Sequence, residues 1–363
     1  MNGRFRRFIC FTAVVSVLLI LTGAGAGAYA YGDDYYYDDD RIIVVSLGDS
    51  YSSGEGIEPF YGQQASSINE KVKISDWLAH RSSKSWPALL TVGGSRTMGS
   101  YKSDSGQYGS YVWYFAAVSG ATTANLTAPQ IKTVKVAEVS FWGIKFKKLG
   151  DFSLSPQLSV FNGMYGVADY VTITLGGNDV CFADIIQTCV LNSTYLGSHA
   201  LENQLNGLWK DIPQTKAKLK EAYRSIRRAA GEQATIIVAG YPKLLDRGGK
   251  GIAISKKEAE LVNDSVTRFN LVIKGIVDDC RASGMDIYYV DVETEFDRDG
   301  GHQAYSKNAW INPVYLGSKA QDLDASAIAS SYSVHPNELG AQAYARCVNA
   351  KIKELEEAKH AAH

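Results

Sequence analysis

IIVVSLGDSYSSGEG, residues 42–56, joins an apolar, β-branched run to a polar, glycine-spaced corner that carries Ser50. Valine and isoleucine that do not alternate with polar residues predict a strand buried on both faces, as in a parallel sheet. In an open α/β sheet, ligands bind at the carboxyl ends of the strands. On its own, however, the corner is at least as typical of a serine that only caps the next helix. Whether Ser50 is a helix cap or a reactive serine therefore depends on which other groups the rest of the chain supplies.

Four more β-rich runs follow, and helical patterns separate most of them. The runs lie at 111–118, 169–175, 234–239 and 286–290. Helical periodicity fills residues 201–230, a capping pattern at Ser255 starts a helix that should reach Arg281, and residues 333–340 open a last helix. Strands that alternate with helices predict a parallel, doubly wound sheet. We therefore expect an α/β fold, a flavodoxin-like three-layer sandwich with a parallel sheet of about five strands and helices on both faces.

Two segments interrupt this alternation. Residues 57–109 are polar and rich in glycine and serine, which predicts loop with one short helix at 86–92. Residues 132–148 interleave valine, phenylalanine, tryptophan and isoleucine with lysines, which is typical of a hairpin on the surface. The same amphipathic pattern also suits contact with lipid or with a substrate chain. A plain surface hairpin is the simpler interpretation.

The N-terminus has the features of a secretory signal peptide. Three arginines precede the apolar run 8–21, and residues 28–30 supply the small side chains that signal peptidase requires. The alternative is an uncleaved membrane anchor, because residues 23–30 extend the uncharged run toward the ~20 residues that span a bilayer. We expect a signal peptide (1–30), an acidic, tyrosine-rich leader (31–40), one main domain (41–357) and a tail (358–363). The protein should be secreted, without stable membrane insertion after cleavage.

Charge and cysteine content exclude several classes of function. Loss of residues 1–30 leaves 34 basic and 38 acidic residues, a net charge of −4, and no basic patch favours nucleic acid. Four cysteines remain, an even number that predicts disulfides in an oxidising space and permits three pairings. Their spacings do not suit a zinc knuckle, and the acids of residues 291–299 lack the EF-hand spacing. No metal site is therefore predicted.

Four positions follow strand ends or lie in a terminal loop, where a doubly wound sheet gathers its reactive groups. They are Ser50, Gly120, Asn178 and His335. A serine becomes a nucleophile when a base takes its proton, and an imidazole can accept and return a proton near neutral pH. Backbone N–H groups at glycine turns and a carboxamide can donate to the resulting oxyanion. The set predicts a hydrolase. The remaining histidines are expected in structural or solvated positions: His80, His199, His302, His360 and His363.

In this order, the segments resemble the four sequence blocks of the SGNH, or GDSL-type, hydrolase family, and they span residues 48–340. The blocks are GDSYSSG (48–54), SGATT (119–123), GGND (176–179) and HPN (335–337). The resemblance implies that Ser50 is the nucleophile and that His335 is its general base. It also implies an oxyanion hole formed by the backbone N–H groups of Ser50 and Gly120 and by the Asn178 side chain. The main domain, 41–357, would then be an SGNH hydrolase domain.

The resemblance is greatest to secreted actinobacterial esterases and lipases of this family. It rests on HRS (80–82), WINP (310–313) and the spacing of Cys181 and Cys189. Those relatives often have a cysteine at the position of Ala79, which implies that one of their disulfides is missing here. We expect a Cys181–Cys189 bond, because it closes a short loop and matches the spacing in the relatives. Cys280 and Cys347 are then paired by elimination.

One position departs from the family pattern. An aspartate usually stands three residues before the histidine, and this chain has Tyr332 there. A phenol stays neutral near pH 7, so it is a poor partner for a developing imidazolium. We expect a Ser50–His335 dyad in which the backbone carbonyl of Tyr332 orients the imidazole, which resembles an arrangement in some actinobacterial members. The rival hypothesis is a carboxylate from the preceding loop, Asp322 or Asp324.

The resemblance implies a secreted serine hydrolase, an esterase or lipase, that cleaves carboxylic esters through an acyl-enzyme on Ser50. We expect a monomer that uses no cofactor and takes an ester or lipid as its small-molecule substrate. Two alternatives stay open: a carbohydrate O-deacetylase of the same family, and a cell-surface binding protein with a degenerate site. The intact set of four blocks favours the hydrolase.

Overall fold

The structure is a computed structural model that describes residues 41–63, 74–102, 110–140, 143–164, 166–182, 184–186, 199–248 and 254–361. The predicted signal peptide (1–30) and leader (31–40) lie outside the described residues. None of the helices in the described part of the chain combines the length and the apolar character needed to cross a membrane.

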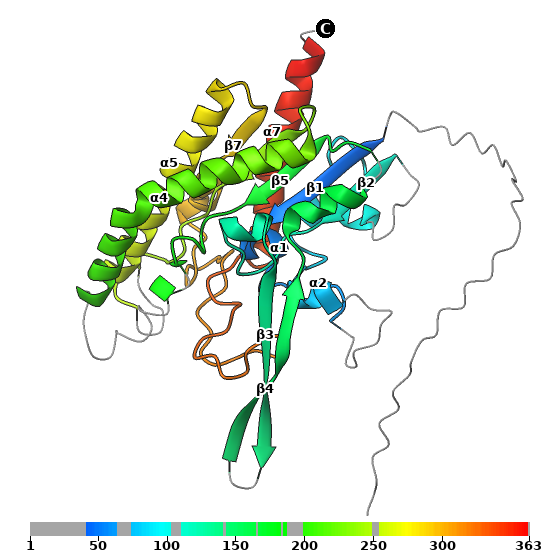
Figure 1. Cartoon of the computed structure of the whole chain (residues 1–363). Coiled ribbons are helices and arrows are strands. Elements are labelled where there is room, and N and C mark those ends of the chain that lie inside the picture. The colour runs from blue at the N-terminus through cyan, green and yellow to red at the C-terminus, as the bar shows by residue number, and fades with distance from the viewer. Residues whose placement is uncertain are drawn as a thin grey trace, which may run out of the picture. The chain divides into compact units, whose positions relative to one another are not determined.

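A five-stranded parallel sheet forms the centre of the fold (Figure 1). Its strands, in spatial order, are β2 (Tyr111–Phe115), β1 (Ile42–Gly48), β5 (Tyr170–Thr174), β6 (Thr235–Ala239) and β7 (Ile287–Val290). Each strand pairs in parallel with its neighbour. This is the flavodoxin-like strand order, and it confirms the predicted fold class. Every residue of β5 and β6 is buried, as expected for strands covered on both faces.

Long helices cover the two faces of the sheet. α4 (His199–Ala230) packs against α5 (Lys256–Ala282), and α7 (Glu338–Ala361) contacts β6 and β7. Figure 1 shows α4 in front of the sheet and α7 behind it. The predicted capping pattern is confirmed at the start of α5, where the Glu258 N–H donates to the Ser255 hydroxyl at 3.2 Å. α7 continues through Ala361, so most of the segment expected to be a tail is helical.

Short helical elements fill the connections. The α-helical ones are α1 (Ser50–Ser53), α2 (Ile74–Leu78) and α6 (Glu293–Phe296). The 3₁₀ helices are η1 (Pro87–Leu89), η2 (Met98–Tyr101), η3 (Thr123–Leu126), η4 (Gln157–Gly163) and η5 (Arg298–Gly300). η1 lies within residues 86–92, where the sequence predicted one short helix, but α2 and η2 also lie within residues 57–109, so that region contains more short helices than predicted.

A separate two-stranded hairpin, β3 (Gln130–Ser140) and β4 (Gly143–Leu154), projects from the main sheet (Figure 1). It confirms the hairpin predicted for residues 132–148. The base of the hairpin buries Val134 and Leu154 in a small second core with Leu78 and Val118. The outer part of the hairpin is largely exposed. Its position is therefore set by contacts at its base.

The predicted Cys280–Cys347 disulfide is wrong, because both thiols are free. Cys280 is buried on α5 near Lys220 and Arg224 of α4, whereas Cys347 lies on α7 near Glu295 of α6. Pairing by elimination could not take account of these different surroundings. Cys181 is also a free, exposed thiol, and its predicted partner Cys189 lies outside the described residues.

Candidate active site

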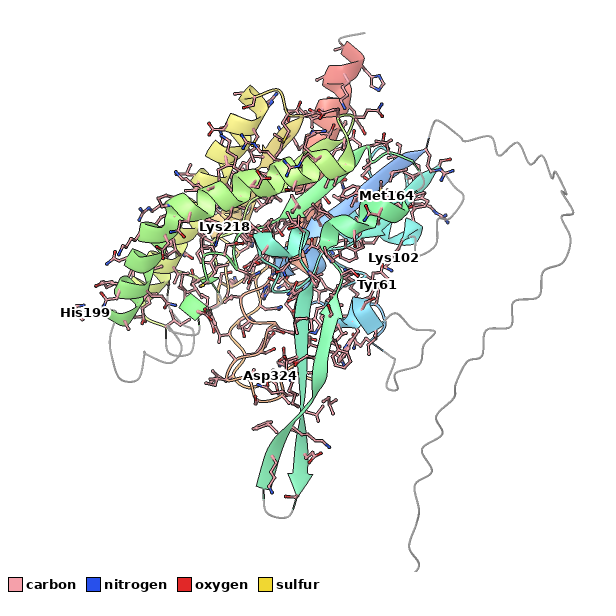
Figure 2. All side chains as sticks on the ribbon, viewed as in Figure 1. Tyr61, Lys102, Met164, His199, Lys218 and Asp324 are labelled. Atoms are coloured by element: carbon pink, nitrogen blue, oxygen red, sulfur yellow. The ribbon has the colours of Figure 1, made fainter. Side chains whose placement is uncertain are left out.

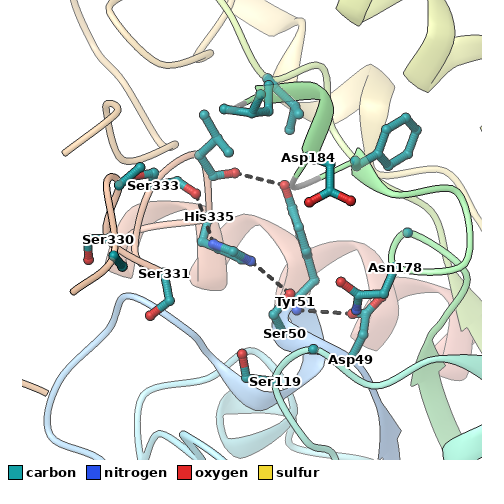
Figure 3. Close-up of a pocket in the computed structure, with 18 of the residues that line it drawn as sticks. Asp49, Ser50, Tyr51, Ser119, Asn178, Asp184, Ser330, Ser331, Ser333 and His335 are labelled. Atoms are coloured by element: carbon teal, nitrogen blue, oxygen red, sulfur yellow. Dashed lines mark hydrogen bonds between the residues drawn. The ribbon is translucent and has the colours of Figure 1, made fainter. Parts of the chain in front are cut away.

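Ser50 and His335 form a hydrogen-bonded pair where β1 ends (Figure 3). Ser50 is the first residue of α1, whose N-terminus is capped by the Asp49 carboxylate through the Tyr51 N–H at 3.1 Å. His335 comes from the loop before α7, 285 positions further along the chain. The Nε2 atom of His335 lies 2.7 Å from the Ser50 hydroxyl oxygen. The fold thus joins the first and last blocks identified in the sequence.

The backbone carbonyl of Ser333 orients the imidazole. The Nδ1 atom of His335 lies 3.0 Å from that oxygen (Figure 3). A carbonyl can only accept, so Nδ1 carries the proton and Nε2 is left to accept from the Ser50 hydroxyl. This is the tautomer that a general base needs.

The predicted role of Tyr332 as the orienting residue is therefore wrong by one position. The Tyr332 carbonyl accepts from the backbone N–H of His335 at 3.4 Å, and the Tyr332 phenol donates to Glu58 at 2.9 Å. The cause is local backbone geometry: Val334 has a left-handed φ of 55° and turns the chain between Ser333 and His335. A residue count along the chain does not reveal such a turn.

The two rival carboxylates form other contacts. Asp324 pairs with Lys135 of the hairpin at 2.6 Å, and Asp322 accepts from the backbone N–H of Ser331 at 2.9 Å. A different acid, Glu55, lies near His335 and raises its pKa, against the desolvation that lowers it below the usual 6.5. Desolvation thus has the larger effect, and the imidazole is held in its neutral form.

Glu55 is almost fully buried and was not singled out in the sequence. Its carboxylate lies 2.6 Å from Nδ1 of His80 and accepts from the Ser331 hydroxyl at 2.9 Å. Burial is the largest single effect and would raise the pKa of Glu55, but His80, together with His335 and Ser119, lowers that pKa to about 2. The signal in the sequence was an acid between two glycines, directly after the serine corner. His80 is buried against Glu55, which agrees with its predicted structural position.

The residues predicted for the oxyanion hole line the same pocket as Ser50. Gly120 has a left-handed φ of 74°, a conformation that favours glycine. The Asn178 carboxamide donates to the Ala121 carbonyl at 2.9 Å. A carboxamide nitrogen carries two hydrogens, so the second is left for a substrate oxygen. Ser50, Gly120 and Asn178 are thus brought together by loops that follow β1, β2 and β5.

Two hairpin residues donate to the peptide group between Ser119 and Gly120, which also contains the Gly120 N–H. Lys132 Nζ and Gln130 Nε2 both donate to the Ser119 carbonyl, at 2.5 and 2.9 Å. Desolvation lowers the pKa of Lys132 to about 8, and Glu55 partly opposes this shift. Neither residue stands out in the sequence, because a lysine that alternates with apolar residues in a hairpin is usually solvated.

A second cluster of hydrogen bonds, centred on Asp49, holds the turn that carries Ser50. The Asp49 carboxylate accepts from the Thr174 hydroxyl at 2.7 Å and from the Tyr241 phenol at 2.5 Å. Burial raises the pKa of Asp49 to about 6 in spite of these hydrogen bonds. The cluster ties α1 to the end of β5, so the position of Ser50 is fixed from two strands.

A cavity of about 460 Å³ opens beside Ser50 and His335. One part of its wall is polar and contains the three residues predicted for the oxyanion hole. Another part is apolar, with the side chains of Phe182, Ile186, Leu244, Val266, Ile328 and Val334. A nucleophile, a base and hydrogen-bond donors thus meet next to an apolar wall. Such a site can bind an acyl group and attack its carbonyl carbon.

The chain is similar to known lipases along most of its length. A sequence profile of the GDSL-like lipase/acylhydrolase family matches residues 44–348. A lipase of Streptomyces rimosus is 28% identical over 274 residues, which cover 75% of this chain and 76% of that protein. Lipase 1 of Streptomyces coelicolor is 27% identical over 270 residues, 74% of this chain and 75% of that protein.

A solved structure agrees with these sequence matches. The crystal structure of the extracellular lipase from Streptomyces rimosus superposes with a TM-score of 0.57 at 25% identity, and the match covers 85% of this chain and 99% of that one. The family profile spans far more than half of the sequence, and its blocks surround the Ser50–His335 pair. The chain therefore belongs to the GDSL-like lipase/acylhydrolase family.

Proposed function

We propose that this protein is a secreted carboxylic ester hydrolase that works through an acyl-enzyme on Ser50. The observation that carries the proposal is the 2.7 Å contact between His335 Nε2 and the Ser50 hydroxyl, with Nδ1 held by a carbonyl. Secretion is supported by the N-terminal signal pattern and by the similarity to an extracellular lipase. The catalytic group is then a dyad of Ser50 and His335, with a backbone carbonyl in the place of a third side chain.

In the first half-reaction, Ser50 attacks the ester carbonyl while His335 takes the hydroxyl proton on Nε2. The oxyanion accepts from the N–H groups of Ser50 and Gly120 and from the Asn178 carboxamide. The imidazolium is stabilised by the Ser333 carbonyl and by the buried charge of Glu55. It then returns its proton to the leaving alcohol, and the acyl-enzyme remains. In the second half-reaction, water attacks the acyl-enzyme with His335 again as the base. This step releases the carboxylic acid and restores Ser50.

The apolar part of the cavity wall favours acyl chains longer than acetyl. Ile186, Leu244 and Val266 come from three different segments, yet they line one cavity with Ser50. An acetyl group would leave much of this wall in contact with water, whereas a longer chain would cover it. We therefore favour an esterase or lipase over a carbohydrate O-deacetylase.

A series of p-nitrophenyl esters from acetate to palmitate tests the proposal. We expect kcat/KM to rise with chain length beyond acetate, and we expect Ser50→Ala to abolish both the burst of p-nitrophenol and the steady turnover. Asn178→Ala should lower kcat by roughly 10²- to 10³-fold, the usual effect of losing one oxyanion donor. Turnover confined to acetate would favour the deacetylase. A folded protein without turnover on any ester would favour the binding protein.

A further inference from the structure

The hairpin of β3 and β4 carries an unusual share of exposed apolar surface. Among the described residues, nine large apolar side chains are exposed, and four of them lie on this hairpin. They are Ile131 (59%), Ile144 (62%), Phe146 (53%) and Leu149 (58%). Apolar side chains gathered on one element and surrounded by polar residues mark an interaction site rather than random exposure.

The strand register places three of these side chains on one side of the ribbon. Phe146 stands opposite Ala137, and residues that are separated by an even number of positions on a strand share a side. Ile144 therefore shares the side of Phe146. The pairing shifts by one residue between Val134 and Lys135, and the extra residue, Leu149, is on β4, so the alternation along β3 continues and Ile131 shares the side of Ala137. The opposite side of the ribbon is buried at the base of the hairpin, where Val134 lies, and exposed further out, where it carries Lys145 and Lys147.

The hairpin is also basic in a chain that is slightly acidic overall. Residues 130–154 contain five lysines and two acids, a net charge of +3, whereas the whole chain has a net charge of −1. Lys147 lies 3.4 Å from Glu138, and both are more than half exposed. Lys145 forms no ion pair within the part of the chain that the structure describes. A short element that carries exposed apolar groups on one side and lysines on the other matches an anionic lipid surface, because such a surface attracts nearby cations.

This surface is connected to the mouth of the catalytic cavity. The backbone of Lys135 pairs with Leu323 and Ala325 at 2.7 and 3.0 Å, and Asp324 binds the Lys135 side chain. Figure 2 shows Asp324 next to the hairpin, and Figure 1 shows the hairpin and this orange segment at the same end of the sheet. A few residues further on, Ile328 lines the cavity and is itself 52% exposed.

We propose that the tip of the hairpin docks the enzyme on an anionic lipid surface. Ile144 and Phe146, on one side of the ribbon, would insert among the lipids, and Lys145 and Lys147, on the opposite side, would reach the headgroups. The exposed side chain of Ile328 would then face the same surface at the mouth of the cavity. The inference that this surface supplies the substrate rests on the proposed function. The docking itself does not.

Cosedimentation with vesicles tests the docking without catalysis. The full chain with Ser50→Ala is mixed with vesicles of equal parts phosphatidylglycerol and phosphatidylcholine, or of phosphatidylcholine alone. We expect binding to the anionic vesicles, and we expect Ile144→Ser combined with Phe146→Ser to weaken it at least ~10-fold, since two apolar side chains lose their insertion. Lys145→Glu combined with Lys147→Glu should weaken binding to the anionic vesicles only.

Leu271→Ser is the matched control, because Leu271 is 64% exposed on α5 and lies outside the hairpin. The N-terminal segment is the same in all variants and cannot cause a difference between them. Equal vesicle binding by the parent and the Ile144/Phe146 double variant would overturn the proposal. So would a dimer that the double variant abolishes in analytical ultracentrifugation, because the apolar side would then bind a second copy.

Turnover of water-soluble p-nitrophenyl butyrate separates the two proposals. With Ser50 restored, the double variant should hydrolyse this ester as fast as the unmodified protein, because neither side chain lies in the catalytic site. Vesicle binding without ester turnover would contradict the proposed function and leave the docking intact. Ester turnover without vesicle binding would contradict the docking and leave the proposed function intact.

Discussion

At the scale of single residues, the imidazole of His335 is held by a backbone carbonyl, and the aspartates nearby in sequence bind other groups. Asp322 contacts Ser331, and Asp324 pairs with Lys135. A carbonyl accepts a hydrogen bond but adds no full charge. Glu55 supplies that charge from a different place in the chain, next to His80.

This arrangement predicts that the two aspartates can be neutralised without loss of turnover. Asp322→Asn and Asp324→Asn should each keep kcat/KM within about threefold, since neither group touches the reacting atoms. His335→Ala should lose at least ~10²-fold, as expected for removal of a general base. Steady-state kinetics on a soluble ester would measure both effects. A loss of orders of magnitude in a folded aspartate variant would restore the triad.

The pH dependence of turnover follows from the shift of His335. Desolvation lowers its pKa below 6.5, so the neutral, basic form persists to lower pH than for a solvated histidine. The acidic limb of kcat/KM should therefore lie below pH 6.5. Glu55→Gln removes a charge that raises this pKa, so the limb should move to still lower pH. An unmoved limb in Glu55→Gln would show that Glu55 does not act on the imidazole.

At the scale of elements, the hairpin contributes to the catalytic site through β3. Lys132 and Gln130 donate to the carbonyl of Ser119, and the same peptide group contains the N–H of Gly120. A charged donor on the carbonyl polarises the peptide group and strengthens its N–H as a donor. The base of the hairpin thus contacts the predicted oxyanion hole, while its outer part is exposed.

Lys132→Met should therefore lower kcat more than it raises KM, by roughly 10- to 100-fold, if the charged hydrogen bond acts in the transition state. The pKa of Lys132 is about 8, so the unmodified enzyme should lose activity above about pH 8, and the variant should lack this alkaline limb. Lys145→Met is the control, because Lys145 is exposed on the outer hairpin. Identical pH profiles for the Lys132 variant and the unmodified enzyme would assign Lys132 a structural role only.

At the scale of the whole molecule, Glu55 links catalysis to stability. It joins the segment after α1 to His80 and to Ser331, so three distant parts of the chain meet on one buried carboxylate. Its pKa is lowered from 4.5 to about 2, which means that the folded state favours the ionised form more than the unfolded chain does. The stability from this shift is complete above pH 4.5 and is lost as the pH falls toward 2.

The free energy of unfolding should accordingly differ between the unmodified protein and Glu55→Gln in a pH-dependent way. Near pH 7 the variant should be less stable by up to about 3 kcal/mol, and the difference should narrow between pH 4.5 and 2. Urea unfolding at several pH values would measure it. A difference that stays constant with pH would mean that the ionisation of Glu55 does not contribute.

The sequence by itself determined the fold class, and its resemblance to the GDSL-type family predicted the Ser50–His335 pair that the structure brings together. The non-alternating run before Ser50 can only be buried on both faces, and parallel strands place their carboxyl ends, and the loops behind them, at one edge. Local rules of this kind predict elements and the catalytic groups that follow them. The family resemblance, with Tyr332 in place of the usual aspartate, led to the prediction of a backbone carbonyl as the partner of His335.

Only the tertiary structure decided which carbonyl that is, and which distant side chains act on the site. The left-handed turn at Val334 selects Ser333 over Tyr332. The fold places Glu55 against His80, which favours its ionised form near His335. It also brings Lys132 onto the Ser119 carbonyl and keeps Cys280 apart from Cys347. Each of these contacts joins segments that the fold brings together, and their strength depends on desolvation. The local pattern of residues encodes neither which distant segments come into contact nor how far their side chains are removed from water.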